Sequence, residues 1–200
     1  MCNQFQLPSL SAIRKYLATD LHLPLVEPAA TLPQNRAIFP KDQAPVLIYQ
    51  NQQLQLISKS WGYPSPINQQ KVLFNARVER FFENKASMWD TSFAKQRCLI
   101  IADQFFETGK QTYIANQRRY HERFSFRNPD EPLTLIAGIY QADQFAMVTT
   151  SPNAVMSPIH DRMPLVITPQ ELRQWLFQNF SSLVNRSTTP LAASKLPNRN

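Results

Sequence analysis

The sequence predicts an α+β fold, a single domain that is rich in β-strand. Sixteen prolines punctuate the 200-residue chain and favour many short segments over the long helices of a bundle. Short apolar runs with many β-branched and aromatic residues recur along the chain, as they do in strands. With 43% apolar content, the chain can bury one core and is short for two, so we expect one domain over residues 1–200.

The first half of the chain predicts both helices and strands. Residues 9–17 have the apolar spacing of a first helix. Residues 44–49 and 54–58 are apolar runs of strand length. After a long connection, residues 76–82 and 86–93 are predicted as two short helices.

The second half predicts mainly strands, followed by one helix. Four apolar runs have strand composition, at residues 99–106, 133–140, 144–149 and 165–168. Thr168 is a favoured N-cap residue, and Pro169 follows it at the first helical position. A last helix is therefore expected from Pro169 to about residue 180.

The charge balance and the cysteines narrow the class of protein. Lys and Arg outnumber Asp and Glu by 21 to 14, and the net charge of +7 suits a phosphate backbone. Three glycines argue against phosphate-cradling loops. Cys2 and Cys98 give neither a metal spacing nor a disulfide framework, so we expect no cofactor, no metal and a reducing cytoplasm. The chain shows no signal-sequence pattern and no apolar run of membrane length, so no membrane association is expected.

Residues 118–124 (RRYHERF) form the one notable charged cluster, in which cations alternate with aromatic residues. One interpretation is a solvated loop or hairpin end, because long charged side chains commonly serve solubility. The other is an edge that faces DNA. The sequence leaves both open.

Cys2 directly follows the initiator Met1, so removal of Met1 would place an α-amine and a thiol on one residue. The amine can condense with an aldehyde to an imine, and the thiol can then add to the imine carbon and close a thiazolidine ring. An α-amine titrates near pH 7.7–8.0 and a free thiol near about 8.5, so we expect both groups to be partly available at neutral pH. The alternative is an incidental cysteine at a disordered terminus.

Three later segments favour the reactive interpretation, residues 75–79 (NARVE), 97–107 (RCLIIADQFFE) and 159–164 (IHDRMP). Together with residues 1–5 (MCNQF), they resemble the motifs of the SRAP family, the SOS-response-associated peptidases and abasic-site-processing proteins. Each motif alone is weak, but four in the family's order and spacing are specific. The resemblance covers nearly the whole chain.

The resemblance implies a β-rich domain whose twisted sheets form a pseudo-barrel with a few peripheral helices. It also implies a sensor of abasic sites in single-stranded DNA that forms a covalent thiazolidine crosslink through Cys2 after Met1 is lost, with lyase and self-cleaving peptidase activity as further possibilities. Single-stranded DNA with abasic sites is the expected partner, and a monomer the expected state. Two alternatives stay open, a cysteine peptidase that uses Cys2 and His160, and a non-catalytic DNA-binding module.

Cys2, Asn75, Glu107 and His160 are the expected catalytic residues. Glu107 suits an acid/base role, because its aromatic neighbours would remove hydration and raise its pKa, although a strand-end carboxylate can also simply be exposed. By resemblance, His160 stabilises the ring-opened sugar; its alternative is a structural role. Asn75 would hydrogen-bond the amine or backbone of Cys2, or serve as the N-cap of a helix that starts at Ala76.

Arg77 and Arg162 are the expected DNA-binding residues, since guanidinium groups bind phosphates well. Their alternative role is in ion pairs with Glu79 and Asp161. Cys98 is expected to be a small buried hydrophobe.

Several family positions are substituted in this chain. Asn3 and Gln4 replace Gly and Arg, Thr108 replaces a Trp, and Ile67 stands at the second Trp of a Trp-Gly-Leu-(Ile/Val)-Pro-x-Trp motif. The missing Arg at Gln4 removes one expected phosphate contact, so we expect weaker affinity. Residues 185–200 are either a loose tail or, over residues 191–200, a segment that closes the fold.

Overall fold

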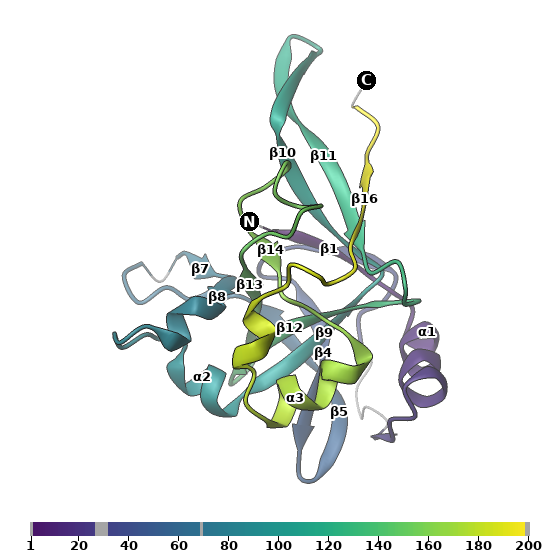
Figure 1. Ribbon diagram of the computed structural model, residues 1–200, viewed down its shortest axis with the longest axis vertical. Coiled ribbons are helices and arrows are strands. Elements are labelled where there is room, and N and C mark those ends of the chain that lie inside the picture. Colours follow the sequence, from purple (N-terminus) through teal and green to yellow (C-terminus); the bar gives the residue numbers. More distant parts are fainter. Residues whose placement is uncertain (1, 27–31, 69, 199–200) are drawn as a thin grey trace.

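The fold combines two twisted β-sheets with a few short helices (Figure 1). It was analysed as a computed structural model, which describes residues 2–26, 32–68 and 70–198. The α+β class predicted from the sequence is confirmed. The two sheets matter for function because the candidate site lies where they meet.

The larger sheet closes into a barrel. Its ring follows the order β13-β12-β9-β4-β5, and β5 then pairs in parallel with β13 through Ser60 and Gln144 and through Trp61 and Phe145. Closure leaves no free edge within the ring, which is how small β-domains avoid unpaired strands. The ring strands are β4 (Gln43–Gln50), β5 (Gln53–Trp61), β9 (Arg97–Ala102), β12 (Thr134–Gln141) and β13 (Gln144–Thr150).

The second sheet has the order β16-β11-β10-β1-β3. The chain passes into it from the barrel at Asp103, between β9 and β10. Phe5 of β1 packs against Trp61 of the barrel with ring centroids 5.2 Å apart, and both rings are fully buried. This contact fixes the start of the chain against the body. The strands are β1 (Gln4–Leu7), β3 (Arg36–Ile38), β10 (Gln104–Ala115), β11 (Arg118–Arg127) and β16 (Ala192–Lys195).

Short elements complete the fold. β8 and β14 extend the barrel beside β13, β15 pairs with β12, β2 with β5, and β6 with β7. The short strands are β2 (Leu25–Val26), β6 (Tyr63–Pro64), β7 (Val72–Leu73), β8 (Asn75–Arg77), β14 (Met163–Pro164) and β15 (Val166–Ile167). The helices are α1 (Leu10–Lys15), α2 (Asp90–Lys95) and α3 (Leu172–Phe177), with a π turn η1 (Tyr16–Asp20) and 3₁₀ turns η2 (Val78–Phe82), η3 (Pro169–Glu171) and η4 (Ser181–Val184).

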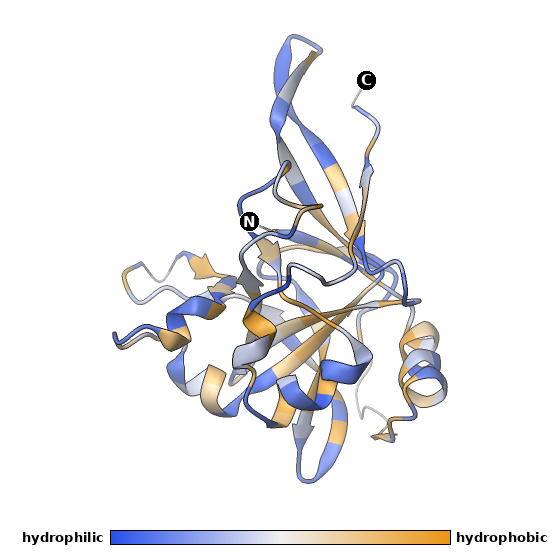
Figure 2. Ribbon diagram, viewed as in Figure 1, coloured by the Kyte–Doolittle hydropathy of each residue, from blue (hydrophilic) through white to orange (hydrophobic). Residues whose placement is uncertain are grey.

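The β10–β11 hairpin projects beyond the body of the molecule (Figure 1). Figure 2 shows the projecting part as mostly hydrophilic, whereas the strands of the body are mostly hydrophobic. The register between the strands shifts between Thr108 and Thr112, so β10 bulges there. The outer half of the hairpin contributes little to the core and is free to serve binding.

The strand predictions hold for residues 44–49, 54–58, 133–140 and 144–149, while residues 165–168 give only the two-residue strand β15. The single strand predicted over 99–106 is wrong. The chain bends at Asp103, whose N–H donates to Gln6 O at 2.9 Å, and so divides between the two sheets.

Two helix predictions needed correction in part. Residues 75–77 form strand β8 rather than helix, and only the 3₁₀ turn η2 follows, so Asn75 is not a helix N-cap. The helix predicted over 86–93 begins only at Asp90.

The first and last helices begin as predicted. Ser9 caps α1 by accepting the Ala12 N–H at 3.0 Å. Thr168 and Glu171 form a capping box at η3, and the helix then ends at Phe177, before the predicted residue 180.

Residues 118–124 are not a loop but form the first part of β11; because they directly follow the turn at Asn116 and Gln117, the interpretation as a solvated hairpin end holds. Of the two alternatives for the C-terminal segment, the described part through residue 198 supports the closing segment. Leu191 is buried, and β16 pairs with β11 from Phe124–Lys195 to Arg127–Ala192.

Candidate active site at the junction of the two sheets

Cys2 lies just before β1, at the entrance to the second sheet, and its side chain is only 1% exposed. The thiol donates to Gln4 O at 3.4 Å. From the barrel side, Asn75 Nδ2 donates to Cys2 O at 2.8 Å. The expected Asn75 contact to the Cys2 backbone is therefore present, and it fixes the direction in which residue 2 leaves the sheet.

Glu107 comes from the neighbouring strand β10. The register pairs Gln4 with Phe106, so the start of β1 and the middle of β10 run side by side. The Glu107 side chain is 4% exposed, and burial raises the pKa of its carboxyl group from 4.5 to about 7. The group is buried within a continuing strand, so the expectation of a raised pKa holds and the exposed strand-end alternative does not.

His160 reaches the same point from the loop that follows β13. Asn153, which is 5% exposed, shapes this loop by accepting the N–H groups of Val155 and Met156, and His160 N–H donates to Met156 O at 2.9 Å. His160 Nε2 then lies 4.0 Å from Glu107 Oε2. That distance is beyond hydrogen-bond length but within electrostatic range.

The contacts of His160 Nδ1 indicate the state of the ring. Nδ1 lies 3.0 Å from Arg162 N, which can only donate, and 2.9 Å from the carboxylate of Asp161, which can only accept. One nitrogen cannot satisfy both. Burial lowers the pKa of His160, so the neutral ring prevails near pH 7, and its Nε2 faces Glu107.

The Cys2 thiol is not partly ionised at neutral pH, as the sequence had led us to expect it to be. Burial, together with the negative charge of Glu107, raises its pKa to about 12. The thiol therefore needs a neighbouring base at the moment of reaction, and Glu107 is the carboxyl group placed beside it. Cys98 is fully buried as expected, and burial raises its pKa as well.

Arg162 is held inside the protein by a partner from another motif. Its Nη1 and Nη2 atoms donate to the two Glu79 oxygens at 2.9 and 2.8 Å, and Nη2 also donates to Thr149 O at 2.8 Å. The side chain is 12% exposed, and its buried Nε makes no hydrogen bond to any described residue. The alternative of an ion pair therefore holds for Arg162, with Glu79 as the partner, and it favours a positioning role for Arg162.

Arg77, by contrast, is exposed at the end of β8, where Thr149 of β13 lies opposite it. Its positive charge contributes to the lowered pKa of Glu79, after the hydrogen bond from Arg162. Arg77 therefore presents a cation on the surface next to the Arg162–Glu79 pair.

Arg123 of β11 is a candidate that the sequence analysis did not single out. Its Nη2 donates to Gln4 Oε1 at 2.5 Å, and its guanidinium lies 5.8 Å from the centre of the Phe106 ring. Gln4 stands where the family pattern has Arg, so a guanidinium from β11 lies beside this position. The only signal in the sequence was the cation-rich cluster at 118–124.

The other substituted positions lie on the surface. Ile67 is 96% exposed, and Thr108 is exposed next to Glu107. Among the described residues, no group of three or more His, Cys, Asp or Glu side chains is placed to hold a metal ion. None of the described helices is both long and apolar enough to span a membrane.

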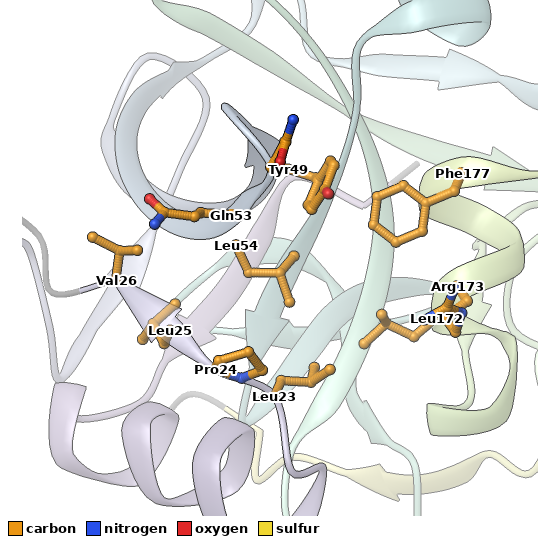
Figure 3. A pocket seen from close by; sticks show the side chains of 11 residues that line it. Leu23, Pro24, Leu25, Val26, Tyr49, Gln53, Leu54, Leu172, Arg173 and Phe177 are labelled. Carbon is orange, nitrogen blue, oxygen red and sulfur yellow. The ribbon is translucent and has the colours of Figure 1, made fainter.

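An apolar pocket of about 330 Å³ lies elsewhere, between β2, the β4–β5 hairpin and α3 (Figure 3). Leu25, Leu54 and Leu172 line it, with Tyr49 and Phe177 at its side. It shares no residue with the predicted site.

Comparison with known proteins places these features in context. The sequence profile described as SOS response associated peptidase (SRAP) matches residues 1–197. The abasic site processing protein YedK of Escherichia coli (strain K12) is 27% identical over 78% of this chain and 69% of its own length. The abasic site processing protein YoqW of Bacillus subtilis (strain 168) is 27% identical over 58% of this chain and 54% of its own length.

Solved structures show the same fold. A crystal structure of a Bordetella bronchiseptica protein superposes with a TM-score of 0.75 at 19% identity, covering 98% of this chain and 100% of that one. A Bacteroides thetaiotaomicron protein gives 0.71 at 18% identity over 98% of this chain and 93% of that one.

Proposed function

The chain belongs to the SOS response associated peptidase (SRAP) family, and on that basis we propose that it captures abasic sites in single-stranded DNA covalently through Cys2. Curated relatives at 27% identity are described as abasic site processing proteins, which supports this substrate. The ring-opened abasic sugar supplies the aldehyde that a 1,2-aminothiol requires.

In the proposed reaction, loss of Met1 frees the α-amine of Cys2, which adds to the aldehyde carbon and gives a carbinolamine. Protonated Glu107 donates its proton to the carbinolamine hydroxyl, which leaves as water, and a protonated imine remains. The Cys2 thiol then gives its proton to the Glu107 carboxylate while sulfur bonds to the imine carbon. The ring closes to a thiazolidine, and Glu107 is again protonated.

The observation that carries the proposal is the placement of Glu107, buried beside Cys2 with its pKa at about 7. A carboxyl group that titrates near the working pH can act as acid in one step and as base in the next. The thiol, whose pKa is raised to about 12, depends on such a base.

Asn75 and His160 complete the arrangement. Asn75 Nδ2 holds the Cys2 carbonyl, while its buried Oδ1 makes no hydrogen bond to any described residue, which leaves it available to accept from the freed amine. His160 presents Nε2 toward Glu107, and the neutral tautomer with its proton on Nε2 can donate to a sugar oxygen.

The test is the intact mass of the protein after incubation with a single-stranded oligonucleotide that contains one abasic site. We expect the summed masses of protein and oligonucleotide less one water, in a product that survives heat. An undamaged oligonucleotide is the control. Binding without this mass would instead indicate a non-catalytic module.

Removal of Met1 is the prerequisite, and N-terminal sequencing of the reactive protein tests it. A Cys2→Ser variant keeps the amine and should stop at the imine, which borohydride can trap. Because strand cleavage by β-elimination also starts from an imine, the same variant separates lyase activity from crosslinking. Equal amounts of heat-stable adduct from variant and parent would remove the thiol from the mechanism.

A further inference from the structure

A groove of about 490 Å³ lies along the β10–β11 hairpin, close in the fold to the start of the chain. It begins at Asn3, Gln4 and Thr108, next to Glu107 in the sequence, and continues to Tyr113 and Tyr120 on the projecting part of the hairpin. None of the described residues that line it is acidic. The groove is therefore positively charged, and it lies on the face of the second sheet opposite Glu107, because Glu107 and Thr108 are successive residues of one strand.

Two tyrosines form the aromatic part of the groove. Tyr113 and Tyr120 lie directly opposite each other on β10 and β11, with ring centroids 5.8 Å apart and ring planes 30° apart. Both remain partly exposed, and Phe39, which is 46% exposed, lines the groove as well. Partly exposed aromatic rings beside cations are the usual platform for unpaired bases.

Two arginines supply the charge. Arg119 is exposed beside the tyrosine pair, and Arg123 lies nearer to Cys2. The hydrogen bond from Arg123 to Gln4 and its position over the Phe106 ring hold this guanidinium in place before any ligand arrives. A cation held in this way loses less conformational entropy on binding a phosphate.

The bulge in β10 fixes the direction of the hairpin relative to the active site. His121 Nδ1 lies 3.0 Å from Gly109 O within the bulge, and Lys110 Nζ donates to Ser157 O, in the loop that carries His160, at 3.3 Å. The contact of Lys110 with Ser157 therefore ties the base of the hairpin to the loop that carries His160.

We propose that this groove binds the nucleotides on one side of the reacting sugar, with bases stacked on Tyr113 and Tyr120 and phosphates on Arg119 and Arg123. The inference rests on the proposed function and adds a route for the strand. A single strand is the occupant that fits, because its bases are free to stack and its phosphates match the charge. A duplex hides the faces of its bases, and a peptide lacks the repeating phosphates.

The experiment compares undamaged single-stranded oligonucleotides of about 3 and about 12 nucleotides, the second within the span typical of stacking grooves. Tyr120→Ala should lower affinity for the longer strand by roughly 5- to 100-fold, the range found for loss of one stacked base, with little effect on the shorter one. Arg123→Gln should reduce the slope of log affinity against log salt by about 0.7. Tyr120→Phe should retain most of the affinity, because stacking needs the ring and not the hydroxyl.

Matched controls come from the apolar pocket of Figure 3. Tyr49→Leu and Arg173→Gln alter an exposed tyrosine and an exposed arginine there, and both should leave affinity unchanged. Melting temperatures of all variants establish that they are folded.

Crosslinking separates the groove from the chemistry. At saturating protein, Tyr120→Ala should crosslink a short abasic oligonucleotide at the parental rate, because the Cys2 site is intact. Unchanged affinity of Tyr120→Ala and Arg123→Gln for the longer strand would overturn the groove and leave the proposed function standing. A parent that binds the strand through the groove but never crosslinks would overturn the proposed function instead.

Discussion

Glu107 is the residue on which the proposed chemistry depends. Glu107→Gln removes a titrating group but keeps the shape of the side chain, so the adduct should form about 10²- to 10⁴-fold more slowly in single-turnover crosslinking, with affinity for undamaged strand retained. Asn75→Ala is the comparison and should slow the reaction less, through misorientation alone. An unchanged rate for Glu107→Gln would move the acid/base role elsewhere.

The raised pKa of Glu107 also predicts how the free energy of unfolding depends on pH. Burial lifts it from 4.5 to about 7, so between these values the folded protein holds a proton that the unfolded chain has lost. The free energy of unfolding should therefore fall as pH rises from about 4.5 to about 7. Denaturant unfolding of the parent and of Glu107→Gln across this range should show the fall in the parent only.

The two arginines of the motifs should behave differently when replaced. Arg162→Ala leaves the Glu79 carboxylate, which is 36% exposed, without its partner, so stability should fall by about 1.5–3 kcal/mol, measured by denaturant unfolding. Arg77→Ala, on the exposed end of β8, should change stability by less than about 0.5 kcal/mol and reduce the salt slope for DNA by about 0.7. The reverse pattern would make Arg162 the phosphate contact.

At this scale the motifs predicted the candidate residues and the contact of Asn75 with the Cys2 backbone, but not the geometry of the other pairs. Cys2, Asn75, Glu107 and His160 were found through motifs, and the structure brings them together. The Arg162–Glu79 fork and the Arg123–Gln4 bond join residues 83 and 119 positions apart. Such pairs follow from strand register, which no local pattern encodes.

Among the elements, the hairpins show why parts of the fold were missed. Asn116 and Gln117 close the β10–β11 hairpin with φ of 46° and 59°, and Asn51 and Gln52 close β4–β5 with φ of 53° and 62°. Turns of this kind usually contain Gly at the second position. Asn-Gln gave no turn signal, and the polar outer strands gave no apolar alternation, so β11 went unpredicted.

These turns lead to a stability prediction. Gln52 has a positive φ of 62°, a conformation that is strained for glutamine. Gln52→Gly should remove about 1–2 kcal/mol of this strain. Glycine loses more conformational entropy on folding, which offsets about 0.5–1 kcal/mol of the gain. The net gain should raise the melting temperature by roughly 1–4 °C. Gln53→Gly, one residue later and within β5, is the control and should lower it. A lower melting temperature for Gln52→Gly would show that the turn is not strained.

Across the whole molecule, the site depends on the meeting of two sheets. Cys2, Glu107 and Arg123 come from the second sheet, whereas Asn75 and the His160 loop come from the barrel side. Barrel closure through β5 and β13 could not be read from the sequence, because it is a parallel contact between residues 84 positions apart, such as Ser60 and Gln144. The class of fold could be predicted because it depends only on local composition.

The C-terminal segment supports this arrangement from outside. β16 covers the edge of β11, Leu196 N–H donates to Arg123 O at 2.8 Å, and Leu191 is 7% exposed. Deletion of residues 191–200 should therefore cost about 3–5 kcal/mol through the lost leucine and the lost ladder bonds. The melting temperature should fall by roughly 6–20 °C.

The same deletion should also weaken binding of long strands more than crosslinking of short ones, because β11 carries Arg119, Tyr120 and Arg123 of the groove, while Cys2 lies just before β1 and Glu107 lies on β10. Deletion of residues 197–200, which leaves β16 intact, is the control and should change neither property. Melting curves, strand affinity and single-turnover crosslinking of the parent and the two deletion variants test whether the C-terminal segment supports β11. A truncated protein with parental stability and parental affinity for long strands would show that residues 191–200 are a loose tail in solution.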